Sequence, residues 1–155
     1  MMITIKDDNF RFGARAGAII YNEDKTKVLL ENQDNGRYIF PGGRIDIHED
    51  STSAIVRELK EELNLEVNPK LKYIVEMFIE APKIKYHEIG LYYLLTIKED
   101  MIANNFHSLD GNGMFEWISI KDLDNYNIVA KPIKDKVVKN QITDEKLEHL
   151  IYREY

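Results

Sequence analysis

The stretch that most constrains this chain runs from Gly42 to Leu65 and reads GGRIDIHEDSTSAIVRELKEELNL. Apolar residues recur in it at every fourth position, at Ile55, Leu59 and Leu63. That spacing predicts a helix over Thr52–Leu63 with one buried stripe. Because successive helical residues are about 100° apart, the carboxylates beside the stripe fall on one arc. They are Glu58, Glu61 and Glu62. The segment therefore predicts a helix whose acidic groups gather on a single face.

Carboxylates gathered in this way destabilise a helix, because like charges at such spacing cost roughly 0.2–0.5 kcal/mol per pair. A hard divalent cation offsets that cost: Mg²⁺ takes oxygen ligands, usually from one or two carboxylates together with substrate phosphates. Arg57 stands close enough in sequence to neutralise and orient the neighbouring carboxylates. A solvated acidic helix face is the ordinary alternative. It leaves unexplained why Gly43, Glu49 and Arg57 frame the acidic residues.

That framing resembles the signature of the Nudix hydrolases, in which a glycine, a glutamate, an Arg-Glu pair, a Glu-Glu pair and a second glycine stand at fixed spacings. Its places are filled here by Gly43, Glu49, Arg57, Glu58, Leu59, Glu61, Glu62, Asn64 and Leu65. Asn64 is the departure, since the family has glycine there. Asn is the second choice after Gly for the left-handed residue that ends many helices, so the departure concerns the helix end and not the carboxylates.

The resemblance implies an α+β fold, a Nudix-type α/β/α sandwich with a mixed β-sheet between helices, built from residues 1–155 as a single Nudix hydrolase domain. It implies Mg²⁺ as cofactor, with Mn²⁺ as a substitute. The implied metal ligands are Glu58, Glu61, Glu62 and the backbone carbonyl of Gly42, although a plain turn is an equal interpretation for Gly42. The implied catalytic residues are Glu58, Glu61, Arg57 and Glu49. Among these, Glu58 is either a base or a ligand, and Glu49 with Arg57 forms an ion pair that holds loop to helix.

The composition limits the classes of protein to which this chain can belong. The chain has 155 residues, of which 44% are hydrophobic and 31% charged, as is typical of a soluble globular protein. Its formal charge of −6 argues against binding to a nucleic acid polymer or an anionic membrane. There is no cysteine, no apolar leader and no apolar run approaching the roughly 20 residues that span a bilayer. We therefore expect a cytoplasmic protein whose partner is a small molecule, and a homodimer is compatible with these features.

Along the chain, residue patterns predict the other elements. Strands are predicted over Met2–Lys6, Ala16–Tyr21, Lys27–Glu31, Leu71–Glu80, His87–Lys98 and Met114–Ile118. The second and third of these form a hairpin, and the fourth and fifth pair antiparallel. Further helices are predicted over Ile133–Lys139 and Thr143–Tyr152, the latter from an apolar stripe of Leu147, Leu150 and Ile151. Asn104–Gly113 is predicted to be a loop. Either Asp50 or Ser51 can cap the signature helix.

Outside the signature, several residue types could contact a substrate. Arginines bind phosphates through bidentate contacts, and the candidates are Arg11, Arg15 and Arg44, each with surface charge as the alternative. An additional acidic ligand or base is sought among Glu76, Glu88, Asp110 and Glu116. Arg15, Arg44 and Glu88 are the preferred substrate contacts. Nucleobase stacking is open to Tyr38, Phe78 and Tyr86, although strand aromatics more often pack in a core. No role is assigned to His48, His107 or His149.

The reaction predicted from these features is hydrolysis of the diphosphate linkage of a nucleoside diphosphate derivative, because metal-held carboxylates can drain charge from phosphate oxygens and activate water. The signature specifies the reaction and not the leaving group. The alternative from another class is a module of the same fold that senses a nucleotide without cleaving it. Loss of an acidic signature residue would favour that alternative, and none is lost here.

Overall fold

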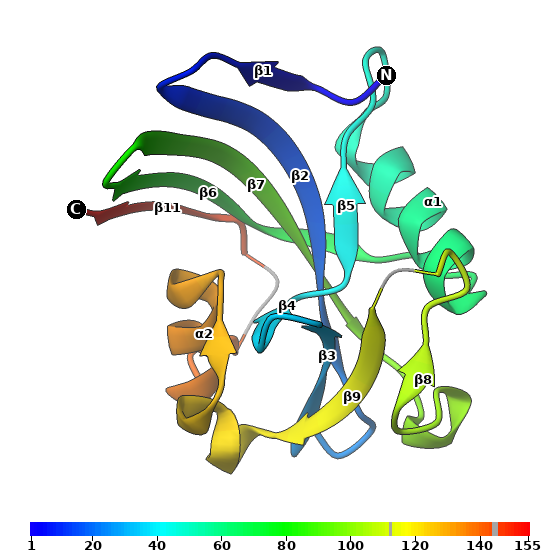
Figure 1. Ribbon diagram of the computed structural model, residues 1–155. Coiled ribbons are helices and arrows are strands. Elements are labelled where there is room, and N and C mark those ends of the chain that lie inside the picture. Colours follow the sequence, from blue (N-terminus) through cyan, green and yellow to red (C-terminus); the bar gives the residue numbers. More distant parts are fainter. Residues whose placement is uncertain (112, 144–145) are drawn as a thin grey trace.

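The computed structural model describes residues 1–111, 113–143 and 146–155, and within them the chain folds around one mixed, strongly bent β-sheet (Figure 1). The strands are β1 Thr4–Lys6, β2 Phe10–Tyr21, β3 Lys27–Gln33, β4 Arg37–Ile39, β5 Gly42–Arg44, β6 Lys70–Ala81, β7 Ile84–Thr96, β8 Phe106–His107, β9 Met114–Ser119, β10 Asn127–Ile128 and β11 Glu148–Glu154. Their main order across the sheet is β10-β4-β3-β2-β7-β6-β11, with β1 and β5 also pairing with β2. The β2–β7, β6–β11 and β4–β10 pairs are parallel and the other named pairs are antiparallel, so the predicted mixed sheet is confirmed.

Helices cover both faces of this sheet. Helix α1, Ser51–Leu63, packs against β2 and β5, and helix α2, Lys131–Val138, lies on the other side (Figure 1). Two short 3₁₀ turns, Glu99–Met101 and Ile120–Asn125, lie in the connections. Each helix closes its own apolar core, one containing Ile55 and Leu59 of α1 and the other containing Ile133 of α2. The predicted α+β sandwich is therefore confirmed.

Helix α1 begins and ends as its residues dictate. The Asp50 carboxylate accepts a hydrogen bond from the backbone N–H of Ser53 at 2.8 Å, so Asp50, rather than Ser51, is the capping residue. At the other end, Asn64 has a φ of +53° and closes the helix in the left-handed conformation. This is the conformation for which the signature normally supplies glycine, and Asn adopts it at small cost. The departure from the signature is thereby accommodated.

Most predicted strands are present with longer bounds. The hairpin predicted over Ala16–Tyr21 and Lys27–Glu31 is formed by β2 and β3, and the predicted antiparallel pair is formed by β6 and β7. The predicted helix over Ile133–Lys139 is α2, which begins earlier because Pro132 fits its first turn. The loop predicted over Asn104–Gly113 contains the short strand β8, and its residue 112 lies outside the described residues.

The helix predicted over Thr143–Tyr152 is wrong. Residues 144 and 145 lie outside the described residues, and Glu148–Glu154 forms strand β11, parallel to β6. Leu150 and Tyr152 alternate toward the core, whereas Ile151 is 59% exposed, so the apolar residues follow the period of a strand. Pairing with the edge of β6 overrode the short helical stripe.

A buried cation anchors β11 at its start. Lys72, which is 2% exposed, donates a hydrogen bond to the backbone oxygen of Lys146 at 2.7 Å and lies 3.0 Å from a carboxylate oxygen of Glu148. It sits where the β6–β7 register shifts between Leu71 and Tyr73.

In the described part of the chain, no helix is long and apolar enough to cross a membrane.

Candidate active site

Arg57 organises the signature by joining the loop before α1 to the helix itself. Its guanidinium donates to both carboxylate oxygens of Glu49, at 2.7 and 2.9 Å, and to Glu58 Oε1 at 2.9 Å. Glu49 also accepts a hydrogen bond from the backbone N–H of Asp46, at 2.9 Å. The Arg57 hydrogen bonds lower the pKa of Glu49. The structure thus brings Glu49 and Arg57 together as the ion pair that the sequence predicted, and aims the arginine at Glu58.

The carboxylates of α1 do not all point the same way. Glu61 has a side chain that is 54% exposed and reaches Arg57 at 3.4 Å. Glu62 is only 5% exposed, and Glu58 lies between these extremes at 13% for its side chain. Burial, followed by a hydrogen bond with Glu58 and the charge of Glu31, raises the pKa of Glu62 well above its ordinary value. Glu58 and Glu62 therefore face inward together, while Glu61 stands at the rim.

A third carboxylate joins them from the sheet. Glu31 of β3 is 6% exposed, and burial raises the pKa of its carboxyl to about 7 against the opposing charge of Arg15, with Asp110 and Glu58 adding to the rise. We call Glu31, Glu58 and Glu62 the carboxylate cluster. Sequence reasoning missed Glu31, which it treated as the last residue of a strand. The available signal was a charged residue that directly follows the apolar run Val28-Leu29-Leu30.

The carboxylate cluster has the chemistry of a divalent cation site. The Oε2 atom of Glu62 is buried and has no hydrogen-bond partner among the described residues, which is costly for a polar atom. Glycine makes room beside the cluster: a Cβ at Gly43 would lie 2.3 Å from Glu58 Oε1. Among the described residues, no group of three or more acidic or histidine side chains already has the arrangement of a metal site. The donors fit Mg²⁺ or Mn²⁺ in type, and their side chains would have to turn toward a bound ion.

Gly42 owes its identity to a neighbouring strand. Its φ is +145°, and a Cβ there would lie 2.1 Å from the carbonyl oxygen of Ala16 on β2. Only glycine allows β5 to approach β2 this closely. The close approach keeps the start of the signature against β2, the strand that also carries Arg15.

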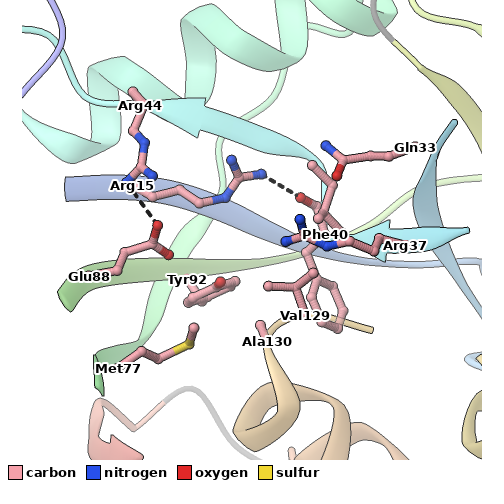
Figure 2. Close-up of a pocket in the computed structure, with 11 residues that line it drawn as sticks. Arg15, Gln33, Arg37, Phe40, Arg44, Met77, Glu88, Tyr92, Val129 and Ala130 are labelled. Carbon is pink, nitrogen blue, oxygen red and sulfur yellow. Dashed lines mark hydrogen bonds and ion pairs between the residues drawn. The ribbon is translucent and has the colours of Figure 1, made fainter. Parts of the chain in front are cut away.

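Arg15 links the carboxylate cluster to a cleft. Its Nη2 donates to the Phe40 carbonyl at 2.9 Å, and its positive charge offsets part of the rise in the pKa values of Glu31 and Glu62. It also lines a cavity of about 200 Å³ together with Arg37, Arg44, Glu88 and Tyr92 (Figure 2). In the same cavity Arg44 Nη1 lies 2.8 Å from Glu88 Oε2. The predicted substrate contacts Arg15, Arg44 and Glu88 are thus brought together in one place.

The remaining candidates are dispersed. Glu76 is bonded to His149 at 2.7 Å on β11, and Glu116 accepts a hydrogen bond from Tyr38 at 3.2 Å. Asp110 lies near enough to Glu31 to affect the pKa of that residue.

Among the aromatic residues considered for base stacking, Phe78 stacks on His87, with ring centroids 4.3 Å apart, and Tyr38 packs edge-on against Tyr126. Tyr86 is 40% exposed and lines the cavities beside Arg11, so it is the aromatic candidate that faces the cleft.

Comparison with known proteins agrees with this geometry. The family model described as NUDIX domain matches residues 11–141, which is most of the chain. The chain belongs to the Nudix family. The resemblance seen in the signature is therefore confirmed, and the matched range includes β2 with its arginines, the carboxylate cluster and α2.

Individual Nudix relatives are distant. The chain is 25% identical over 108 residues to the uncharacterized Nudix hydrolase YvcI of Bacillus subtilis, covering 69% of this chain and 66% of that protein. It is 28% identical over 108 residues to an 8-oxo-dGTP diphosphatase of Buchnera aphidicola, covering 66% and 75% respectively. The matched segments span between 58% and 75% of the curated relatives.

A solved structure described as a MutT protein from Bacillus halodurans superposes with a TM-score of 0.64 at 19% identity, over 92% of this chain and 90% of that one. At that identity the superposition establishes the Nudix fold alone.

Proposed function

We propose that this protein is a divalent-metal-dependent pyrophosphohydrolase that cleaves the diphosphate linkage of a nucleoside diphosphate derivative. Family membership supports hydrolysis of a pyrophosphate bond in general. The observation that carries the proposal for this chain is the position of Arg15, which acts electrostatically on the carboxylate cluster and also lines the cleft. A phosphate held by Arg15 would lie beside oxygens suited to a divalent ion.

Glu31, Glu58 and Glu62 would hold the cation, Mg²⁺ or Mn²⁺. Glu61 and the Gly42 carbonyl, the other ligands that the signature implies, stay predictions. A cation bound there would neutralise charge on the phosphate oxygens and activate a water molecule. Without the ion, protons offset the negative charge of the buried carboxyls, as the raised pKa values of Glu31 and Glu62 indicate. Cation binding should therefore release protons.

Other residues of the chain would position the reacting groups. Arg57 holds Glu58 at 2.9 Å and, through Glu49, fixes the loop that leads into α1. Arg15 and Arg44 would contact phosphate oxygens, with Arg15 held in place by the Phe40 carbonyl. Glu58 can serve either as cation ligand or as base, since it touches both Arg57 and Glu62.

The test is turnover of a panel of nucleoside diphosphate derivatives with and without Mg²⁺. We expect metal-dependent product release that stops with a chelator and falls at least 100-fold in Glu62→Gln. Glu66→Gln is the matched control, because Glu66 has an 86% exposed side chain just beyond α1. Thermal unfolding would show that both variants fold. Saturable binding with no turnover across the panel would instead support the nucleotide-sensing alternative.

A further inference from the structure

The cleft beside Arg15 extends further than a diphosphate requires. The cavity of about 200 Å³ around Arg15 shares Arg37, Arg44 and Glu88 with a neighbouring cavity of about 390 Å³, which is also lined by Arg11. We call this continuous hollow the arginine cleft. It runs along β2 from Arg15, which is next to the carboxylate cluster, toward Arg11 near the start of the strand.

The strand geometry sets the spacing of the two ends. Side chains alternate along a strand, so Arg11, Gly13 and Arg15 share one face of β2. At about 3.3 Å per residue, the Cα atoms of Arg11 and Arg15 are about 13 Å apart. A diphosphate held at Arg15 is shorter than this distance. A single such group therefore leaves the Arg11 end without an anion.

The middle of the arginine cleft is already neutral. Gly13 has no side chain, and a Cβ there would lie 2.5 Å from Arg44 Nη1, so Arg44 lies across β2 at that point. Glu88, the β7 partner of Gly13, meets Arg44 at 2.8 Å. The charge of Arg44 is therefore balanced by Glu88. The remaining N–H groups of Arg44 and oxygens of Glu88 could still bind polar groups of a ligand between the two ends.

The far end keeps an uncompensated positive charge. Within the described residues, Arg11 has no ion pair and lines the larger cavity, whereas Arg37, which has none either, lines both cavities. Lys6 adds a further cation beside Arg11. In a chain of net charge −6, such a local concentration is unusual. Converging guanidinium groups in a concave site suit an anion with several acceptor oxygens, and a dianionic phosphate suits them better than a single carboxylate.

We propose that the substrate carries a second phosphate group, separate from the diphosphate that is cleaved, and that Arg11 binds it at the far end of the arginine cleft. The inference rests on the proposed function for the identity of the diphosphate end. It assigns Arg11 to substrate selection, because Arg11 lies near the start of β2, away from Arg15 and the carboxylate cluster.

Two matched pairs of compounds test it: NADH with NADPH, and dephospho-coenzyme A with coenzyme A. Within each pair the diphosphate is the same and one member has an extra phosphate on the adenosine ribose. Titration calorimetry on the full chain gives the dissociation constants, and turnover with Mg²⁺ is measured separately. In at least one pair we expect the extra phosphate to tighten binding at least tenfold at low salt, with a preference that weakens as salt is added.

The Arg11→Gln variant should reduce that preference to less than threefold while changing the affinity for the member without the extra phosphate by less than twofold. Arg153→Gln is the control, because Arg153 of β11 lies over the ring of Phe78 on β6. This variant should keep the full preference. Equal binding within both pairs, including no detectable binding, would overturn the inference, as would a preference that survives Arg11→Gln.

The two proposals fail in different ways. Hydrolysis of both members of a pair with equal efficiency would refute the second phosphate site and uphold the pyrophosphohydrolase. A preference that depends on Arg11 without any turnover would uphold the second phosphate site and refute the hydrolase.

Discussion

Replacing Glu31 by glutamine removes one negative charge from the carboxylate cluster and keeps almost the same side-chain volume. In the metal-free protein, burial raises the pKa of this carboxyl from 4.5 to about 7. The fold therefore favours the protonated form. Below pH 4.5 both folded and unfolded chains are protonated, and no stability is lost. As the pH rises toward 7, the unfolded chain releases the proton while the folded chain retains it, so the free energy of unfolding falls.

The size of this effect follows from the pKa change. At about 1.4 kcal/mol for each pH unit, the change from 4.5 to about 7 corresponds to a loss of up to about 3 kcal/mol above pH 7. Glu31→Gln cannot ionise and should escape this loss. For a chain of this length that stability corresponds to a rise of roughly 6–12 °C in Tm at pH 8. At pH 4.5 the two proteins should differ little.

The assay is thermal and urea unfolding of chelator-treated protein at pH 4.5 and pH 8, with Glu66→Gln as the exposed control. Adding Mg²⁺ at pH 8 should stabilise the native protein more than the variant, because a cation that binds only the folded chain stabilises it in proportion to its affinity. A variant that is less stable than the native chain at pH 8, or equally stabilised at both pH values, would refute the assignment of Glu31 to the carboxylate cluster.

Other changes separate positioning from packing. Gly43→Ala would push a Cβ against the Glu58 carboxylate, so kcat should fall at least tenfold while the far-ultraviolet circular dichroism is unchanged. Arg57→Lys keeps the charge but loses the two-point hydrogen bonding to Glu49. Denaturant unfolding should show that the free energy of unfolding falls by about 1.5–3 kcal/mol, and turnover should fall as well. Leu59→Ala leaves a cavity under α1 and should cost about 2–5 kcal/mol by the same measurement; a cost below 1 kcal/mol would mean that this core is not tightly packed.

Sequence patterns predicted the elements that short-range chemistry specifies. The period of Ile55 and Leu59 predicted α1, and Asn64 was predicted as its left-handed end. The sequence left the cap at the other end open between Asp50 and Ser51, and the structure gives Asp50. The same reasoning failed at Thr143–Tyr152. There the apolar residues fitted a helix over a short window, and the edge of β6, far away in sequence, decided for a strand.

By itself, the sequence of this protein determined the family, the signature helix and the Glu49–Arg57 pair, because these depend on spacings within a single local segment. The tertiary structure alone decided that Glu31 joins Glu58 and Glu62, that Glu61 stands at the rim, and that arginines of β2, β4 and β5 line one cleft. The physical reason is strand pairing. Strands that pair in a fixed register bring side chains from distant segments to one place, and the burial that follows determines which carboxyl groups keep their protons.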